Sequence, residues 1–157
     1  MTKLDLFISG ETLDLCVPTK DFAYKSDWFS WFNDSKITKF LEQGVYPNTR
    51  EMQEQFLVYN PNRLILIIVN KYGLSIGVIS LSFINYEKQC CDVALVVSDK
   101  GETMLKPFLS LEAMALITSH AFEKMGMQRV NFGQHIKLKR FQNRLELLGY
   151  KLEGLHP

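Results

Sequence analysis

The sequence lacks the features typical of membrane, secreted and metal-binding proteins. No apolar segment reaches the ~20 residues that a membrane-spanning helix needs. The N-terminal stretch MTKLDLFISGETLDL contains acidic residues and no long apolar run, so it does not resemble a signal peptide. Cys16, Cys90 and Cys91 form no CxxC or Cys/His pattern, so we expect no metal site and reduced thiols in a cytoplasm. We interpret Cys91 as a core residue rather than a nucleophile, because cysteines in strands are usually small core side chains.

The chain also lacks an excess of either charge. It has 18 Lys and Arg against 17 Asp and Glu, for a net charge of +1. No overall field therefore attracts it to nucleic acid or to an anionic membrane, and we expect neither partner. The 157 residues, 46% of them hydrophobic and 22% charged, are consistent with a single domain spanning residues 1–157.

The apolar pattern predicts alternating groups of strands and helices. Residues 74–126 hold the central part, in which the strands of LSIGVISLSFINY and CCDVALVVS are followed by the loop SDKGETMLKPF and a long helix that ends before Gly126. The other predicted elements are a hairpin over 4–17, a helix over 21–33, short helices capped by Asp34 or Ser35 and by Asn48 or Thr49, a strand over 64–69, a strand over 129–133, a helix over 139–148 and a strand that begins at Tyr150.

This order of elements resembles the GNAT superfamily of acyl-CoA N-acyltransferases. Local segments resemble one bacterial subgroup of that superfamily: DWFSWFNDSKITKFLEQGVYPNT its substrate-side helices, IGVISLSFINYEKQCCDVALVVSDK its central strands, EAMALITSHAFEKMGMQRV its long helix and next strand, and LELLGYKLEG the end of its last helix. The resemblance implies an α+β fold with a mixed, mostly antiparallel sheet flanked by helices.

The subgroup includes enzymes that resemble acetyltransferases of the nonulosonic-acid and amino-sugar pathways. The resemblance therefore implies transfer of an acetyl group from acetyl-CoA, as co-substrate, to an amine of a nucleotide-linked amino sugar. A different acyl-CoA or a protein amine also fits the same residues. The resemblance further implies that Leu95, Val96 and Val97 flank the pantetheine arm. The pyrophosphate would then lie at the N-terminus of the long helix, where Lys100 and Lys106 add positive charge.

Six further residues are candidates for chemistry or for binding the acceptor. Asp92 begins the cofactor strand, where it could act as the base, although an acidic strand end without a catalytic role explains it equally well. His135 is a candidate acid for the leaving thiol. The remaining four match subgroup positions near the acceptor: Trp31, Asp34, Tyr46 and Asn85. Trp31 also fits a core position, because it belongs to an aromatic stripe at helical spacing.

The sequence departs from the family pattern in its cofactor loop and last helix. The family loop has two glycines, whereas Gly101 is the only glycine here, several residues too early, and Pro107 removes an amide donor. Leu138 and Leu145 occupy the positions of the family's CoA-contacting Asn and general-acid Tyr, and leucine can do neither job. These departures leave a second hypothesis open, a catalytically degenerate binding or assembly module.

The last departure concerns the end of the sheet. The chain stops soon after LEG, so we expect the last strand of the family sheet to be missing and one sheet edge to stay open. Because open edges pair readily with other strands, a homodimer through that edge is plausible.

Overall fold

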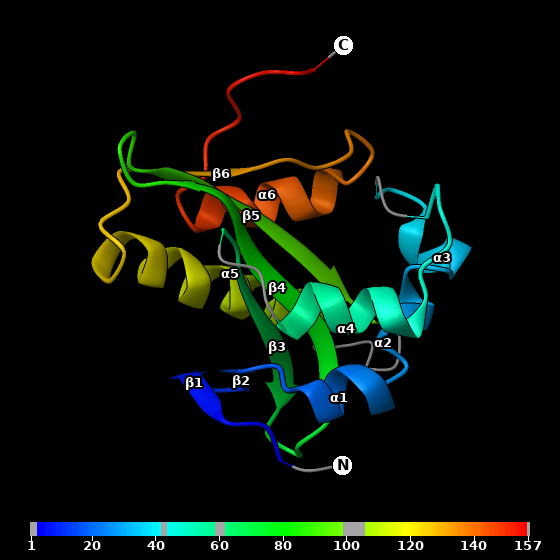
Figure 1. Ribbon diagram of the computed structural model, residues 1–157. Helices are drawn as coiled ribbons and strands as arrows, with labels where there is room; N and C mark the ends of the chain where they lie inside the picture. The colour runs from blue at the N-terminus through cyan, green and yellow to red at the C-terminus, as the bar shows by residue number, and fades with distance from the viewer. Residues whose placement is uncertain (1–2, 42–43, 59–61, 99–105, 157) are drawn as a thin grey trace.

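The computed structural model describes residues 3–41, 44–58, 62–98 and 106–156. A single sheet runs through it in the order β1-β2-β3-β4-β5-β6, with helices on both faces (Figure 1). The strands are β1 (Leu6–Ser9), β2 (Leu13–Cys16), β3 (Leu64–Asn70), β4 (Ser75–Asn85), β5 (Cys90–Val97) and β6 (Arg129–Phe132). The helices are α1 (Lys20–Lys25), α2 (Trp28–Trp31), α3 (Ser35–Thr38), α4 (Arg50–Val58), α5 (Lys106–Glu123) and α6 (Lys139–Leu147).

Five strands of this sheet form an antiparallel series, and the sixth runs parallel to its neighbour. Neighbouring strands from β1 to β5 pair antiparallel, whereas β6 pairs parallel with β5. A parallel neighbour needs a long crossover connection, which α5 provides. The predicted fold class, an α+β fold with a mixed, mostly antiparallel sheet flanked by helices, is confirmed.

The larger core lies between the sheet and helices α5 and α6. Ile79 and Leu81 of β4, Cys91 and Val93 of β5, and Ile117 of α5 are all at most 4% exposed. Alternate residues of each strand face this core, as the period of a strand requires. Their burial fixes which face the intervening residues of β4 and β5 occupy.

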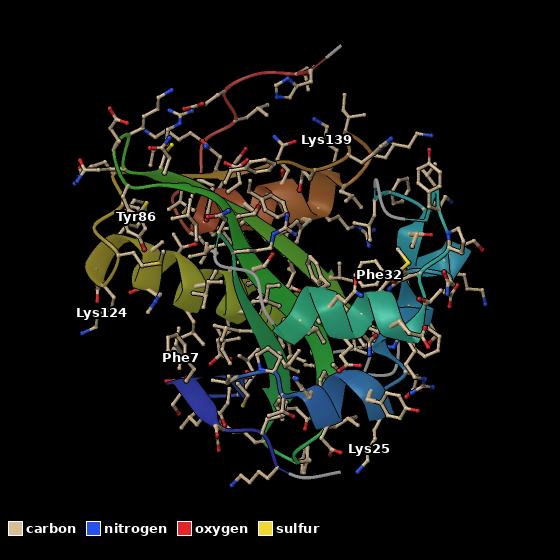
Figure 2. The ribbon with its side chains drawn as sticks, in the orientation of Figure 1. Phe7, Lys25, Phe32, Tyr86, Lys124 and Lys139 are labelled. Atoms are coloured by element: carbon tan, nitrogen blue, oxygen red, sulfur yellow. The ribbon has the colours of Figure 1, made fainter. Side chains whose placement is uncertain are left out.

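A second, smaller core covers the opposite face of β3 and part of β4. Trp28 packs edge-on against Phe32, labelled in Figure 2, with ring centroids 4.9 Å apart, and stacks on Phe56 at 5.9 Å. Val78 of β4 is buried in the same cluster. The aromatic stripe in the sequence therefore packs inward against the sheet.

The predicted helix over residues 21–33 is wrong as one continuous element. α1 ends at Lys25, Ser26 adopts an extended conformation (φ −75°, ψ 152°), and α2 begins at Trp28. The buried Gln53 of α4 donates to the Ser26 hydroxyl at 3.1 Å and to the Ala23 carbonyl. This tertiary contact satisfies the groups freed where the helix breaks, and a helical periodicity alone does not reveal it.

Side-chain caps start the short helices where the sequence predicts them. Asp34 accepts from the backbone N–H of Lys36 at 2.8 Å, at the start of α3. Thr49 accepts from the N–H of Met52 at 3.2 Å, at the start of α4. Because a capping oxygen satisfies an otherwise unpaired N–H, these two residues fix where the helices begin.

The predicted strand at Tyr150 is also wrong. Residues 150–156 follow α6 without regular structure, and β6 stays at the edge of the sheet with no strand on its outer side among the described residues. The Tyr150 hydroxyl instead lies 2.6 Å from the hydroxyl of Thr118 on α5. Burial raises the pKa of Tyr150, so the phenol keeps its proton for this hydrogen bond. A homodimer through the open edge stays a prediction.

Candidate active site

The main feature of the candidate site is that β5 extends beyond its neighbour β6. The two strands pair from Cys90 with Arg129 to Val93 with Phe132, where β6 ends. β5 then continues to Val97 while its other edge stays paired with β4, down to Gly77 opposite Val97. Residues 94–97 therefore have backbone groups on the β6 side with no strand partner among the described residues. A strand edge of this kind can pair with an extended ligand.

Alternation along this free end divides the side chains between the two faces. Leu95 and Val97 pack against the core under α5. Ala94 is exposed although it lies in the middle of the sheet, so the opposite face is uncovered at this point. Gly77 lets β4 and β5 approach closely here, since a Cβ on it would lie 2.6 Å from the Val96 carbonyl oxygen. The three residues predicted to flank pantetheine, Leu95, Val96 and Val97, therefore lie on this free end.

Asp92 lies on the uncovered face, two residues before Ala94. It is half-buried, between Ser82 of β4 and Asn131 of β6 in the sheet register. Asn131 donates its side-chain N–H to Asp92 Oδ1 at 3.0 Å. The carboxylate thus stands where β5 and β6 separate, with one oxygen held by a neighbouring strand.

His135 lies in the turn between β6 and α6. Its ring contacts Phe40, which follows α3, at a centroid distance of 4.9 Å. The Lys137 N–H donates to His135 Nδ1 at 3.2 Å, which leaves the Nε2 edge of this exposed ring for other partners. His135 therefore joins the turn after β6 to the segment after α3.

The four predicted acceptor residues come from separate parts of the structure. Trp31 is 7% exposed and belongs to the smaller core, while Tyr46 is 81% exposed. Asp34 caps α3. Asn85 ends β4 and accepts from the Lys88 N–H at 2.8 Å, within the turn to β5. Trp31 and Asp34 belong to neighbouring short helices whereas Asn85 belongs to the β4–β5 turn, and the role of the four residues in binding stays a prediction.

The predicted phosphate-binding residues lie mostly beyond the described part of the chain. Lys100 and Gly101 fall outside the described residues, and Lys106 is the first residue of α5. Leu145, at the position of the family's general-acid tyrosine, is 6% exposed and packs in the larger core. Leu138 stands just before α6, where its carbonyl accepts from Phe141 and Gln142. Both leucines have structural roles here.

The cysteine at β5 behaves as a core side chain, as the sequence indicated. Cys91 is 0% exposed, and burial raises the pKa of its thiol to about 11. A thiol with that pKa is protonated at neutral pH and is a poor nucleophile.

Among the described residues, no cluster of three or more His, Cys, Asp or Glu side chains could hold a metal ion. Within the same part of the chain, no helix has the length and apolar character needed to cross a membrane.

Sequence reasoning missed Asn131, the partner of Asp92. Its neighbour Arg129 was also missed: Arg129 Nε donates to Asn131 Oδ1 at 2.8 Å. The alternation of the RVNF strand places these two side chains on one face, away from the apolar Val130 and Phe132. What the sequence could not supply was the register between β6 and β5.

Solved structures of acetyltransferases share this architecture. An acetyltransferase of the GNAT family from Bacillus anthracis superposes with a TM-score of 0.76 at 17% identity, over 95% of this chain and 86% of that one. A ribosomal L7/L12 alpha-N-protein acetyltransferase in complex with coenzyme A gives 0.77 at 11% identity, over 96% and 86%. Spermidine N-acetyltransferase from Vibrio cholerae, in complex with CoA and spermine, gives 0.74 at 13% identity, over 91% and 83%.

No family model matches the sequence, and no curated protein sequence matches it significantly. At 11–17% identity the three likenesses establish the fold alone. The chain therefore has the fold of the GNAT acetyltransferases.

Proposed function

We propose that the chain is an N-acetyltransferase that moves an acetyl group from acetyl-CoA to an amine. The observation that carries the proposal is the free end of β5, where residues 94–97 continue past β6 and, within the described part of the chain, have no strand partner on that side. An extended amide-containing chain such as the pantetheine arm of CoA can hydrogen-bond to such an edge in the way a strand does. Two of the solved structures with this fold hold CoA.

The pyrophosphate end of CoA is proposed to lie at the start of α5. An N-terminus of a helix presents unpaired N–H groups and a partial positive charge to an anion. Lys106 is the first residue of α5, and its positive charge is proposed to act at this helix end. The position of α5 directly after β5 in the chain supports binding of one ligand by both elements.

The chemistry needs a neutral amine close to the thioester carbonyl. Asp92 is proposed to take the proton from the acceptor's ammonium group, because it lies on the uncovered face two residues before the free end of β5. His135 is proposed to supply a proton to the departing CoA sulfur from Nε2, as the imidazolium, in which Nδ1 carries a proton and no longer accepts from the Lys137 N–H. A positioned acid or base of this kind contributes about 10²–10⁴-fold to a rate.

The proposed acceptor is the amine of a nucleotide-linked amino sugar. Support comes from the segment 27–49, which resembles the substrate-side helices of enzymes with such acceptors. Solved structures of this fold include acetyltransferases for a polyamine and for a protein N-terminus, so these two amine classes are the alternatives.

A degenerate binding module is the second candidate function. Leu145 buried in the core and Pro107 near the start of α5 favour it, since neither can perform the family role at its position. The test is release of free CoA thiol from acetyl-CoA with three acceptors: spermidine, a peptide N-terminal amine and a nucleotide-linked amino sugar. Turnover with any acceptor supports the enzyme, and a preference for the sugar supports the proposed acceptor. Acetyl-CoA binding without turnover would support the module instead.

A further inference from the structure

A line of polar side chains leads from the C-terminal segment to Asp92. Glu153 forms an ion pair with Arg129 Nη2. Arg129 Nε donates to Asn131 Oδ1 at 2.8 Å, and Asn131 Nδ2 donates to Asp92 Oδ1 at 3.0 Å. Three structural elements, namely the segment after α6, the edge strand β6 and the inner strand β5, are thereby joined through side chains.

This line fixes which way the Asn131 amide points. A guanidinium has only N–H donors, so the group of Asn131 that faces Arg129 must be its oxygen. The NH₂ group of Asn131 then faces Asp92, and the amide cannot flip without placing two donors, or two acceptors, against each other. This orientation directs an N–H donor of Asn131 toward Asp92.

We infer that Asn131 is a positioning residue for Asp92, held in its orientation by Arg129. The inference rests on the proposed function. With Oδ1 of Asp92 engaged by Asn131, the other carboxylate oxygen, Oδ2, is left to receive a proton on the uncovered face beside Ala94. A side chain that is half-buried and held on one side loses little freedom when it acts, which keeps the base aligned.

The proton transfer balances as follows. An N–H bond of the acceptor's ammonium breaks and the proton passes to Asp92 Oδ2, so the nitrogen regains its lone pair. That lone pair forms the new C–N bond to the acetyl carbonyl carbon, the C–S bond to CoA breaks, and the nitrogen releases a second proton to solvent, which leaves a neutral amide. The CoA sulfur takes a proton from His135, which regains one from solvent, and Asp92 later loses its own proton to solvent. Asn131 takes no part in bond making, because its role is to hold the carboxylate.

The test is a double-mutant cycle on kcat with acetyl-CoA and whichever of the three amines is turned over. Asp92→Asn is expected to lower kcat about 10²–10⁴-fold. Asn131→Ala is expected to lower kcat about 10–100-fold while KM for acetyl-CoA changes less than about twofold, because misplacement affects the reacting geometry and not cofactor binding. The double variant is expected to be no slower than Asp92→Asn alone, since Asn131 acts only through Asp92.

Two further variants separate positioning from a purely structural role. Arg129→Met frees the Asn131 amide without touching Asp92 and is expected to lower kcat, and Arg129→Lys, which keeps a donor, is expected to restore part of the loss. Asn143→Ala on the exposed side of α6 is the matched control and is expected to leave kcat unchanged. Thermal unfolding of each variant checks that the fold persists.

The outcomes distinguish failure of the positioning role from failure of the proposed acetyltransferase function. If the wild type is active and the Asn131→Ala and Asn143→Ala variants have the same kcat, the positioning role of Asn131 is overturned and the proposed function is not. Losses that multiply in the double variant also overturn it, because the two residues would then act independently. A folded wild type that neither binds acetyl-CoA nor turns over any amine overturns the proposed function, and the role of Asn131 falls with it.

Discussion

Replacing Gly77 with alanine tests whether the free end of β5 depends on close packing against β4. The added Cβ would lie 2.6 Å from the Val96 carbonyl oxygen and 3.2 Å from the Val97 Cα. Both are backbone atoms of β5, so neither can rotate away as a side chain would. It would also lie 3.2 Å from Ile68 Cδ1, which can move. Relief of the clash therefore requires β5 to shift at the residues proposed to bind pantetheine.

The size of the effect follows from the cost of overpacking a close-packed interior. Such insertions typically cost about 1–3 kcal/mol. At about 2–4 °C per kcal/mol for a chain of this size, the Tm of Gly77→Ala should fall by roughly 2–12 °C. Affinity for acetyl-CoA should fall as well, because the displaced backbone is the proposed ligand edge.

The assay is thermal unfolding together with calorimetric titration of acetyl-CoA. Gly154→Ala is the matched control, because a Cβ there has no heavy atom within 4 Å and the expected change is close to zero. A Gly77→Ala variant as stable as Gly154→Ala would refute the packing argument. Lower stability with unchanged acetyl-CoA affinity would refute the link between this packing and the ligand edge.

Three more predictions concern stability and reactivity. Glu112→Ala should lower the free energy of unfolding in urea by about 1–3 kcal/mol, because the Glu112 carboxylate accepts hydrogen bonds from three donors in the β1–β2 turn. The control is Glu123→Ala, at an exposed position on the same helix, which should leave the free energy of unfolding unchanged. Iodoacetamide at pH 8, followed by mass spectrometry, should label the half-buried Cys90 before Cys91, whose pKa is about 11, and equal labelling would contradict the buried site. Burial lowers the pKa of His120 in the folded chain, so as the pH falls the imidazole is protonated in the unfolded chain before it is protonated in the folded one. The free energy of unfolding should therefore fall as the pH drops below about 6.5. His120→Gln should reduce the difference between the free energies of unfolding measured in urea at pH 8 and at pH 5. An unchanged difference would contradict the prediction.

Continuous apolar runs made the sheet predictable from the sequence. LILIIV and SIGVISLS are largely buried because both faces of these strands pack against apolar clusters, and a continuous apolar run of this length is typical of such a strand. The break at Ser26 was not predictable, because it depends on the buried Gln53 reaching back from α4, which a local pattern does not contain.

The candidate residues came from the resemblance, their roles stay predictions, and the sequence could not supply the contacts between them. The cofactor strand was expected to begin at Asp92, whereas β5 begins at Cys90. The contact of Asp92 with Asn131 could not be predicted, because the register of two parallel strands is set by the crossover through α5 rather than by nearby residues. The substitution of Leu145 for a polar residue was visible in the sequence, and its burial explains why leucine is stable there.

The central claim is that the free end of β5 and the start of α5 bind CoA. The most direct test is calorimetric titration of the purified chain with acetyl-CoA, using Lys106→Glu at the start of α5. The matched control is Lys124→Glu, just past the other end of α5, where Figure 2 labels Lys124. The account predicts micromolar binding that Lys106→Glu weakens about tenfold, or about 1.4 kcal/mol, and that Lys124→Glu leaves unchanged. Absence of binding at millimolar acetyl-CoA, or equal weakening by both substitutions, would contradict it.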